Sequence, residues 1–334
     1  MTSYSNSCSD RATGVAARAA DEEAVRALYE VAPYPDLGAD PKTLEPFLRP
    51  VEADLARMKS VRLLDAGCGT GHLLVGIATR HPDWVCCGID LSEASISLAG
   101  ELARHHRVTV DLRRCSFLDP LPFAAGTFNV IVAMGTIHHA AEPLTALKVL
   151  RDALDDDGLL LLHLYGWRAD AGKFDLKAAL DLLQPDLADH AGRFALYDAL
   201  MRHRERRLLH RIATMSLVDL YAGIRTRLRH WRRRQRNESW SPPWTHRYRT
   251  PTSPWIDHFC HPCERAYEVP AVRSLVEAAG FRLYRNLHQG IPHPRLVPPE
   301  WRDAIDALDP WQQMRMFEVL ADGGGSFAMW LKKA

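Results

Sequence analysis

Four side chains that could bind a metal ion lie within six positions of one another. The stretch "DHFCHPCERAYEVP" contains His258, Cys260, His261 and Cys263. A structural zinc site needs two separated pairs of ligands that close a tetrahedron around the ion. Cys260 and Cys263 form one pair, but no cysteine follows, and interleaved ligands on one short segment can rarely all face one ion. We therefore predict no metal ion here or elsewhere in the chain.

A glycine-rich loop offers a different chemistry. In "VRLLDAGCGTGHLL" an apolar run typical of a buried parallel strand ends at Asp65, and glycines follow at positions 67, 69 and 71 before a helix-like run. Glycine permits close approach of the backbone to a ligand, and a helix start offers free N–H groups. A second apolar run ends at Asp90, where a carboxylate can accept hydrogen bonds from both hydroxyls of a ribose. This order of features predicts a nucleotide-binding site.

The spacing of the loop, D-x-G-x-G-x-G, resembles motif I of the class I S-adenosylmethionine-dependent methyltransferases. The segments "FNVIVAMGTIHHAAEP" and "LTALKVLRDALDDDGLLLLHLYG" look like the fourth strand and the helix, turn and fifth strand of that family, so the resemblance covers roughly residues 60 to 166. It implies an α/β fold with the Rossmann-like, seven-stranded sheet of class I methyltransferases, the seventh strand antiparallel. It also implies S-adenosylmethionine as the cofactor.

The family pattern implies roles for the residues of the cofactor site. Asp65 and the glycine loop would hold the amino-acid end of the cofactor, Asp90 the ribose, and Leu91 the adenine. Ser116 stands where an acid often accepts from the adenine amino group, so Ser116 and Phe117 are assigned to the adenine contact. The full predicted cofactor set is Asp65, Gly67, Cys68, Gly69, Gly71, Asp90, Leu91, Ser116, Phe117 and Met134.

Two further segments resemble a bacterial subfamily of these enzymes. The segment "YE..PYP", upstream of the loop, would cover the cofactor cleft, which makes Tyr29 and Tyr34 candidates for lining it. The later segment resembles D-x-(aromatic or Leu)-x-H-P-x-E-x-x-Y-x-V, with Asp257, His261 and Tyr267 at the polar positions. Asp257 and His261 would orient or deprotonate the acceptor and Tyr267 would line its pocket, or all three would only staple the segment through hydrogen bonds.

Residues after the fourth and fifth strands complete the predicted acceptor site. His138 and His139 follow the fourth strand, where they either pack at a helix start or contact the substrate. Tyr165 ends the fifth strand, and ligands of open α/β sheets bind outside the carboxyl ends of strands. We therefore assign Tyr165 a catalytic role beside His261 and Asp257.

The chain divides into four regions. We expect an N-terminal tail and capping helix at 1–59, the cofactor-binding core at 60–166, a helical, arginine-rich lid insertion at 167–256, and a return segment with the last two strands at 257–334. Apolar spacing in the insertion predicts two or three helices, interrupted at Pro185 and Gly192.

The net charge of the whole chain is +1, but one segment is strongly basic. Residues Arg202 to Arg236 include twelve arginines and only two acidic residues, Glu205 and Asp219. Nucleic-acid binding is one interpretation. No RNA-binding module accompanies the cluster, so we favour a solvated face of the lid helices. No apolar run approaches the ~20 residues of a membrane span, and the seven cysteines are scattered. We therefore expect a cytoplasmic location, reduced thiols and no membrane partner.

Together these patterns predict an enzyme that transfers the methyl group of S-adenosylmethionine to a small-molecule acceptor. One alternative is a non-methylating enzyme that cyclises or cleaves the cofactor and releases methylthioadenosine. Others are an RNA methyltransferase, or a binding module without turnover. The acceptor, its reacting atom and the oligomeric state stay open at this point.

Overall fold

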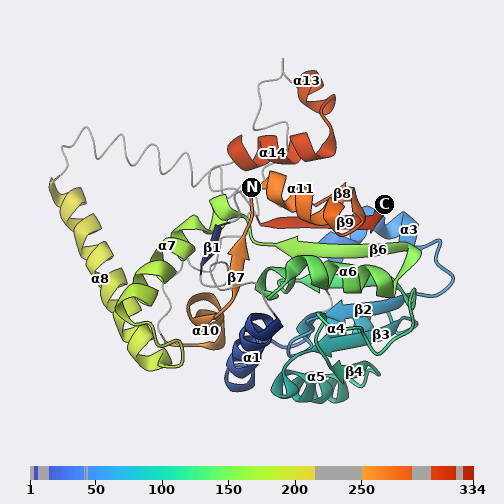
Figure 1. Ribbon diagram of the computed structural model, residues 1–334, viewed down its shortest axis with the longest axis horizontal. Coiled ribbons are helices and arrows are strands. Elements are labelled where there is room, and N and C mark those ends of the chain that lie inside the picture. Colours follow the sequence, from blue (N-terminus) through green and yellow to red (C-terminus); the bar gives the residue numbers. More distant parts are fainter. Residues whose placement is uncertain are drawn as a thin grey trace.

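A seven-stranded sheet forms the centre of the computed structural model, which describes residues 4–6, 15–40, 42, 44–214, 250–287, 302–320 and 326–334. The strand order is β4-β3-β2-β5-β6-β9-β8 (Figure 1). β9 runs antiparallel to β6 and β8, and the other neighbours are parallel, which confirms the predicted fold. The strands are β2 (Arg62–Ala66), β3 (Val85–Asp90), β4 (Asp111–Arg114), β5 (Phe128–Met134), β6 (Leu154–Leu164), β8 (Phe281–Asn286) and β9 (Phe327–Lys333).

Helices cover both faces of this sheet because alternate strand residues point to opposite sides. In β5, Val130 and Val132 pack toward α4 (His72–Arg80), with α5 (Glu93–His106) beside it. Ile131 and Ala133 pack toward the opposite layer. That layer consists of α6 (Pro143–Ala153), α11 (Val269–Ala278) and α14 (Pro310–Leu320), which α13 (Arg302–Asp306) precedes. Three short elements, α2 (Glu45–Leu48), η1 (Arg49–Val51) and α3 (Glu52–Leu55), flank α4.

A second, smaller core lies beside the sheet. It joins α1 (Val15–Val31), α7 (Trp167–Leu183), α8 (His190–Thr214) and α10 (Ser253–Cys260), which cluster to one side of the strands in Figure 1. Leu28 of α1 packs there with Tyr197 of α8 and with Trp255 and Phe259 of α10. The two-stranded sheet of β1 (Tyr4–Asn6) and β7 (Glu264–Ala266) returns the chain toward α11. This core holds the N-terminal helix against a segment more than 200 residues away in sequence.

The helices between β6 and β7 differ in one respect from the prediction. α7 ends at Leu183, ahead of Pro185, as expected for a residue that disfavours helix before it. Gly192, however, lies in the first turn of α8, where its N–H donates to Asp189 Oδ1 at 2.9 Å. Its predicted interruption of the helix is therefore wrong. Most of the segment from Arg202 to Arg236 lies outside the described residues.

None of the helices in the described part of the chain is long and apolar enough to span a membrane.

A fully buried ion pair joins α7 to β7. Lys173 Nζ of α7 lies 2.5 Å from Glu264 Oε1 of β7, and neither side chain is exposed. The same ammonium lies 4.0 Å from the ring centroid of Tyr165, at the end of β6. A charge buried in this way is stabilised only while its partner is present.

Lys173→Met should lower the free energy of unfolding by about 3 to 5 kcal/mol, because Glu264 would be left as an uncompensated buried charge. The double variant Lys173→Met/Glu264→Leu should recover much of the loss. Arg273→Ala, which breaks an exposed pair with Glu277, is the control and should cost under about 1 kcal/mol. Urea denaturation followed by circular dichroism measures all three, and an unchanged Lys173→Met midpoint would contradict the importance of the pair.

Candidate functional site

A cavity of about 430 Å³ lies at the carboxyl ends of the parallel strands, where α1 and α10 meet the sheet. It gathers most of the predicted site residues from segments distant in sequence. From the cofactor set, those lining it are Asp65, Gly67, Cys68, Gly69, Asp90, Leu91, Ser116, Phe117 and Met134. From the acceptor set, those lining it are Tyr29, Tyr34, His139, Tyr165 and Asp257.

Four predicted residues are not among those that line the cavity. Gly71, at φ +85°, ends the glycine loop and precedes α4. His138 is buried with its ring centroid 3.9 Å from that of Tyr165. His261 is buried beside His139, and Tyr267 lies in the main core with its N–H donating to the Tyr165 carbonyl at 2.9 Å. Direct ligand contact by these residues stays a prediction.

Hydrogen bonds to Asp90 fix the backbone of the glycine loop, residues 67 to 71, which forms a cradle for a ligand. One carboxylate oxygen of Asp90 accepts from the Gly69 N–H and the other from the Ser92 N–H, both at 2.9 Å. A Cβ at Gly69 would lie 2.2 Å from the Tyr34 carbonyl oxygen, and φ there is +52°. The loop therefore needs glycine at this position, because the N-terminal segment containing Tyr34 lies directly on it.

Asp65 lacks a partner for one of its oxygens. The side chain is 2% exposed, and Oδ2 accepts no hydrogen bond from the described residues. Burial and the neighbouring Asp90 raise the pKa of Asp65 to about 7. A buried carboxyl in this state is best satisfied by a cationic ligand group. The orphan oxygen and the glycine cradle thus fit the amino-acid end of S-adenosylmethionine.

Glu22 of α1 was missed by the sequence reasoning. It lines the cavity, and its Oε1 accepts a short hydrogen bond from Ser116 Oγ. Ser116 is the position where the family pattern usually has an acid, so α1 brings a carboxylate to the place where the core lacks one. Two features of the sequence could have indicated Glu22: the missing acid at position 116 and the acidic start of the run "DEEAVRALYE".

Helix α1 is fixed to the core on both sides of this carboxylate. The Glu30 carboxylate accepts from the N–H groups of Glu93 and Ala94, at 2.7 and 3.1 Å, where α5 begins. Arg18 donates to the Leu118 carbonyl and to Asp119, both at 2.8 Å. Carboxylates at a helix start satisfy otherwise unpaired N–H groups and the helix dipole. The helix therefore forms a fixed wall of the cavity.

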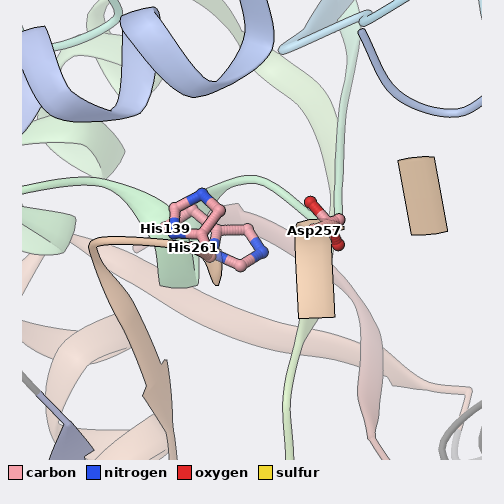
Figure 2. A group of neighbouring side chains, drawn as sticks. All are labelled: His139, Asp257 and His261. Carbon is pink, nitrogen blue, oxygen red and sulfur yellow. The ribbon is translucent and has the colours of Figure 1, made fainter. Parts of the chain in front are cut away.

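Asp257, His139 and His261 form a buried cluster at the other end of the cavity (Figure 2). One potential ligand atom from each lies within 4.8 Å of the other two. The two imidazole rings lie over one another with centroids 3.9 Å apart, and the Asp257 carboxylate lies beside them. Tyr29 OH of α1 donates to Asp257 Oδ1 of α10 at 2.7 Å. Neither Cys260 nor Cys263 contributes a side chain to this group.

The peptide groups of Cys263 assign opposite tautomers to the two rings. The carbonyl can only accept, so His139 Nδ1, at 3.1 Å, carries a proton and Nε2 presents a lone pair. The N–H of Cys263 can only donate, so His261 Nδ1, also at 3.1 Å, is the acceptor and Nε2 carries the proton. A metal ion would need a lone pair from each imidazole. The cluster offers one, which suits the prediction that no metal binds.

Burial favours the neutral form of the buried histidines His139, His163, His258 and His261. Burial lowers the pKa of His139, with smaller opposing effects from Asp257 and Glu264. Burial lowers the pKa of His258 and of His261 well below the ordinary value, and that of His163 to about 4. His139 can therefore accept a proton at neutral pH.

Comparisons with known proteins show which families and folds this chain resembles. The family model described as "Methyltransferase domain" matches residues 64–160. A protein of Synechococcus, syc1184_c, is 24% identical over 264 residues, 78% of this chain and 57% of its own. A ubiquinone biosynthesis O-methyltransferase of Cereibacter sphaeroides is 34% identical over 103 residues, 31% of this chain and 40% of its own.

The solved structure of PKMT2 from Rickettsia typhi in complex with AdoHcy shares the fold. It has a TM-score of 0.63 and 16% identity, and the match covers 90% of this chain and 55% of that one. The chain thus spans about half the length of the relatives it matches most extensively. Residues 64–160 therefore match a methyltransferase domain, in a chain that has the class I methyltransferase fold.

Proposed function

We propose that this protein transfers the methyl group of S-adenosylmethionine to a small-molecule acceptor bound in the same cavity. The observation that supports this most directly is the shared lining of one space. The cradle of Gly67, Gly69 and Asp90 forms one end, and Tyr165, His139 and Asp257 form the other. Helices α1 and α10 both contribute to the lining, so the acceptor end is bounded by protein.

The proposed mechanism depends on positioning. The cofactor, when bound, supplies an electrophilic methyl group on a sulfonium sulfur. Asp65 would pair with its ammonium, Asp90 with its ribose and Glu22 with its adenine amino group. Orientation of the reactants can supply effective molarities of ~10⁵ M or more. The rings of Tyr29, Tyr34 and Tyr165 would favour a cationic sulfur by about 0.5 to 2 kcal/mol.

The named relatives support the coarse reaction. The Cereibacter relative is named as an O-methyltransferase of ubiquinone biosynthesis, and its match covers 31% of this chain. The residues that would face the acceptor include Tyr29 and Asp257, which come from α1 and α10. The relatives therefore support the type of reaction, and the identity of the acceptor has to be argued from these residues of this chain.

A product assay separates methyl transfer from cleavage of the cofactor. Purified protein incubated with S-adenosylmethionine should form S-adenosylhomocysteine only when a metabolite extract is added, because the methyl group needs an acceptor. Liquid chromatography with mass spectrometry measures both products. Methylthioadenosine formed without extract would instead establish the cyclising or cleaving reaction. Activity that disappears after nuclease treatment of the extract would indicate an RNA acceptor.

Asp65→Asn should weaken S-adenosylmethionine binding and stabilise the ligand-free protein. Folding raises the pKa of Asp65 from 3.8 to about 7. Ionisation of Asp65 therefore lowers the free energy of unfolding by its full amount above pH 7 and has no effect below pH 3.8. At about 1.4 kcal/mol per pKa unit, the variant gains up to about 4 kcal/mol at pH 8 and less at pH 5. Thermal melts at both pH values, with and without S-adenosylhomocysteine, measure this. An equal gain at both pH values would refute the assigned ionisation.

Glu22→Ala should weaken S-adenosylhomocysteine binding about 10-fold, the effect of losing one hydrogen bond to a charged group. Glu23→Ala is the matched control, because Glu23 is the next residue of α1 and its exposed carboxylate pairs with Arg26. Isothermal titration calorimetry measures both affinities. If the two variants bind equally well, Glu22 does not hold the adenine.

A further inference from the structure

The cavity wall is acidic. Its described lining residues include four carboxylates, Glu22, Asp65, Asp90 and Asp257, and neither lysine nor arginine. Three of these face the expected parts of the cofactor under the function proposed above. The fourth, Asp257, lies at the acceptor end of the cavity and faces no expected part of the cofactor. Its role needs a separate explanation, because a buried carboxylate without a cation is costly.

Asp257 is poorly neutralised by the protein. It is 3% exposed, accepts from Tyr29 OH, and forms no salt bridge with any residue in the described ranges. Burial raises its pKa. A cationic ligand group beside the carboxylate would remove this penalty, whereas an anionic acceptor would increase it.

His139 supplies a second acceptor at the same place. It lines the cavity, and its Nε2 lone pair is left for a ligand because Nδ1 is bonded to the Cys263 carbonyl. One ring nitrogen of His139 and one carboxylate oxygen of Asp257 lie within 4.8 Å of one another. A ligand atom between them must therefore donate to both. A hydroxyl has one hydrogen to donate, whereas the ammonium of a primary amine has three.

We propose that the acceptor is an amine that binds as an ammonium ion between Asp257 and His139. This rests on the proposed function and specifies its substrate class. One ammonium proton passes to His139 Nε2, and the freed nitrogen lone pair forms the N–C bond while the S–C bond breaks and S-adenosylhomocysteine leaves. Asp257 then stabilises both the imidazolium and the methylated ammonium.

His261 acts as a positioning residue. Its ring lies over that of His139, and both are bonded to the backbone of Cys263. Because its Nε2 carries a proton, it cannot complete a three-ligand site for a metal cation with His139 and Asp257. An amine is therefore favoured over a divalent cation as the occupant.

Binding of three probes of the same shape tests the substrate class. Benzylamine, benzyl alcohol and benzyl mercaptan are titrated into the protein loaded with S-adenosylhomocysteine. Benzylamine should bind at least about 10-fold more tightly than the other two, since a charged hydrogen-bonded pair adds roughly 1.5 kcal/mol or more. Asp257→Asn should abolish the preference, and Asp175→Asn, an exposed carboxylate on α7, should preserve it. Equal binding of the three probes by the unaltered protein would overturn the proposal.

The tautomers are tested independently of turnover. In protein labelled with ¹⁵N-histidine, signals assigned with His139→Gln and His261→Gln should show the proton of His139 on Nδ1 and that of His261 on Nε2. Unchanged S-adenosylhomocysteine affinity in both variants establishes that they fold. A reversed assignment, or stoichiometric Zn²⁺ binding that His139→Gln removes, would overturn the proposal. Methyl transfer to benzyl alcohol in place of benzylamine would overturn the proposal of an amine acceptor and would still support methyl transfer. Amine-selective binding without any methylated product would count only against methyl transfer.

Discussion

Burial of carboxylates without protein cations is the constraint on which the site depends. Asp65 and Asp257 lie in one cavity with little exposure, and burial raises the pKa of each. Tyr29 donates a hydrogen bond to Asp257, whereas Asp65 Oδ2 accepts none from the described residues, so a cationic ligand group would reduce the cost of burying both carboxylates. The same burial keeps the surrounding histidines neutral. The cavity is therefore prepared for positively charged reactants.

The walls of the cavity come from segments far apart in the sequence. α1 contributes Glu22 and Tyr29, and α10 contributes Asp257, and the two helices share a core around Trp255 and Phe259. The buried pair of Lys173 and Glu264 ties this assembly to the strand that ends at Tyr165. Stability and ligand binding are thus linked, because Tyr29, Tyr165 and Asp257 take part in these contacts and also line the cavity.

Sequence patterns predicted the parts of the site that depend on local geometry. The glycine loop follows β2 directly and Asp90 ends β3, so their positions at the carboxyl ends of parallel strands could be deduced from the sequence. Glu22 could not be found in this way, since its position depends on how α1 docks against the loop containing Ser116. Gly192 was misread because the capping by Asp189 compensates for a residue that usually weakens helices.

The sequence by itself determined the fold class, through the resemblance of its motifs to the class I methyltransferases. Glycine spacing and strand ends also located the cofactor cradle and the residues able to do acid and base chemistry. The tertiary structure decided which of them act together. Only packing brings His139 over His261 and lets the backbone of Cys263 assign a lone pair to one ring and a proton to the other. The bond that sets the His139 tautomer joins residues 124 positions apart, and no local pattern encodes it, whereas the bond between Cys263 and His261 is local.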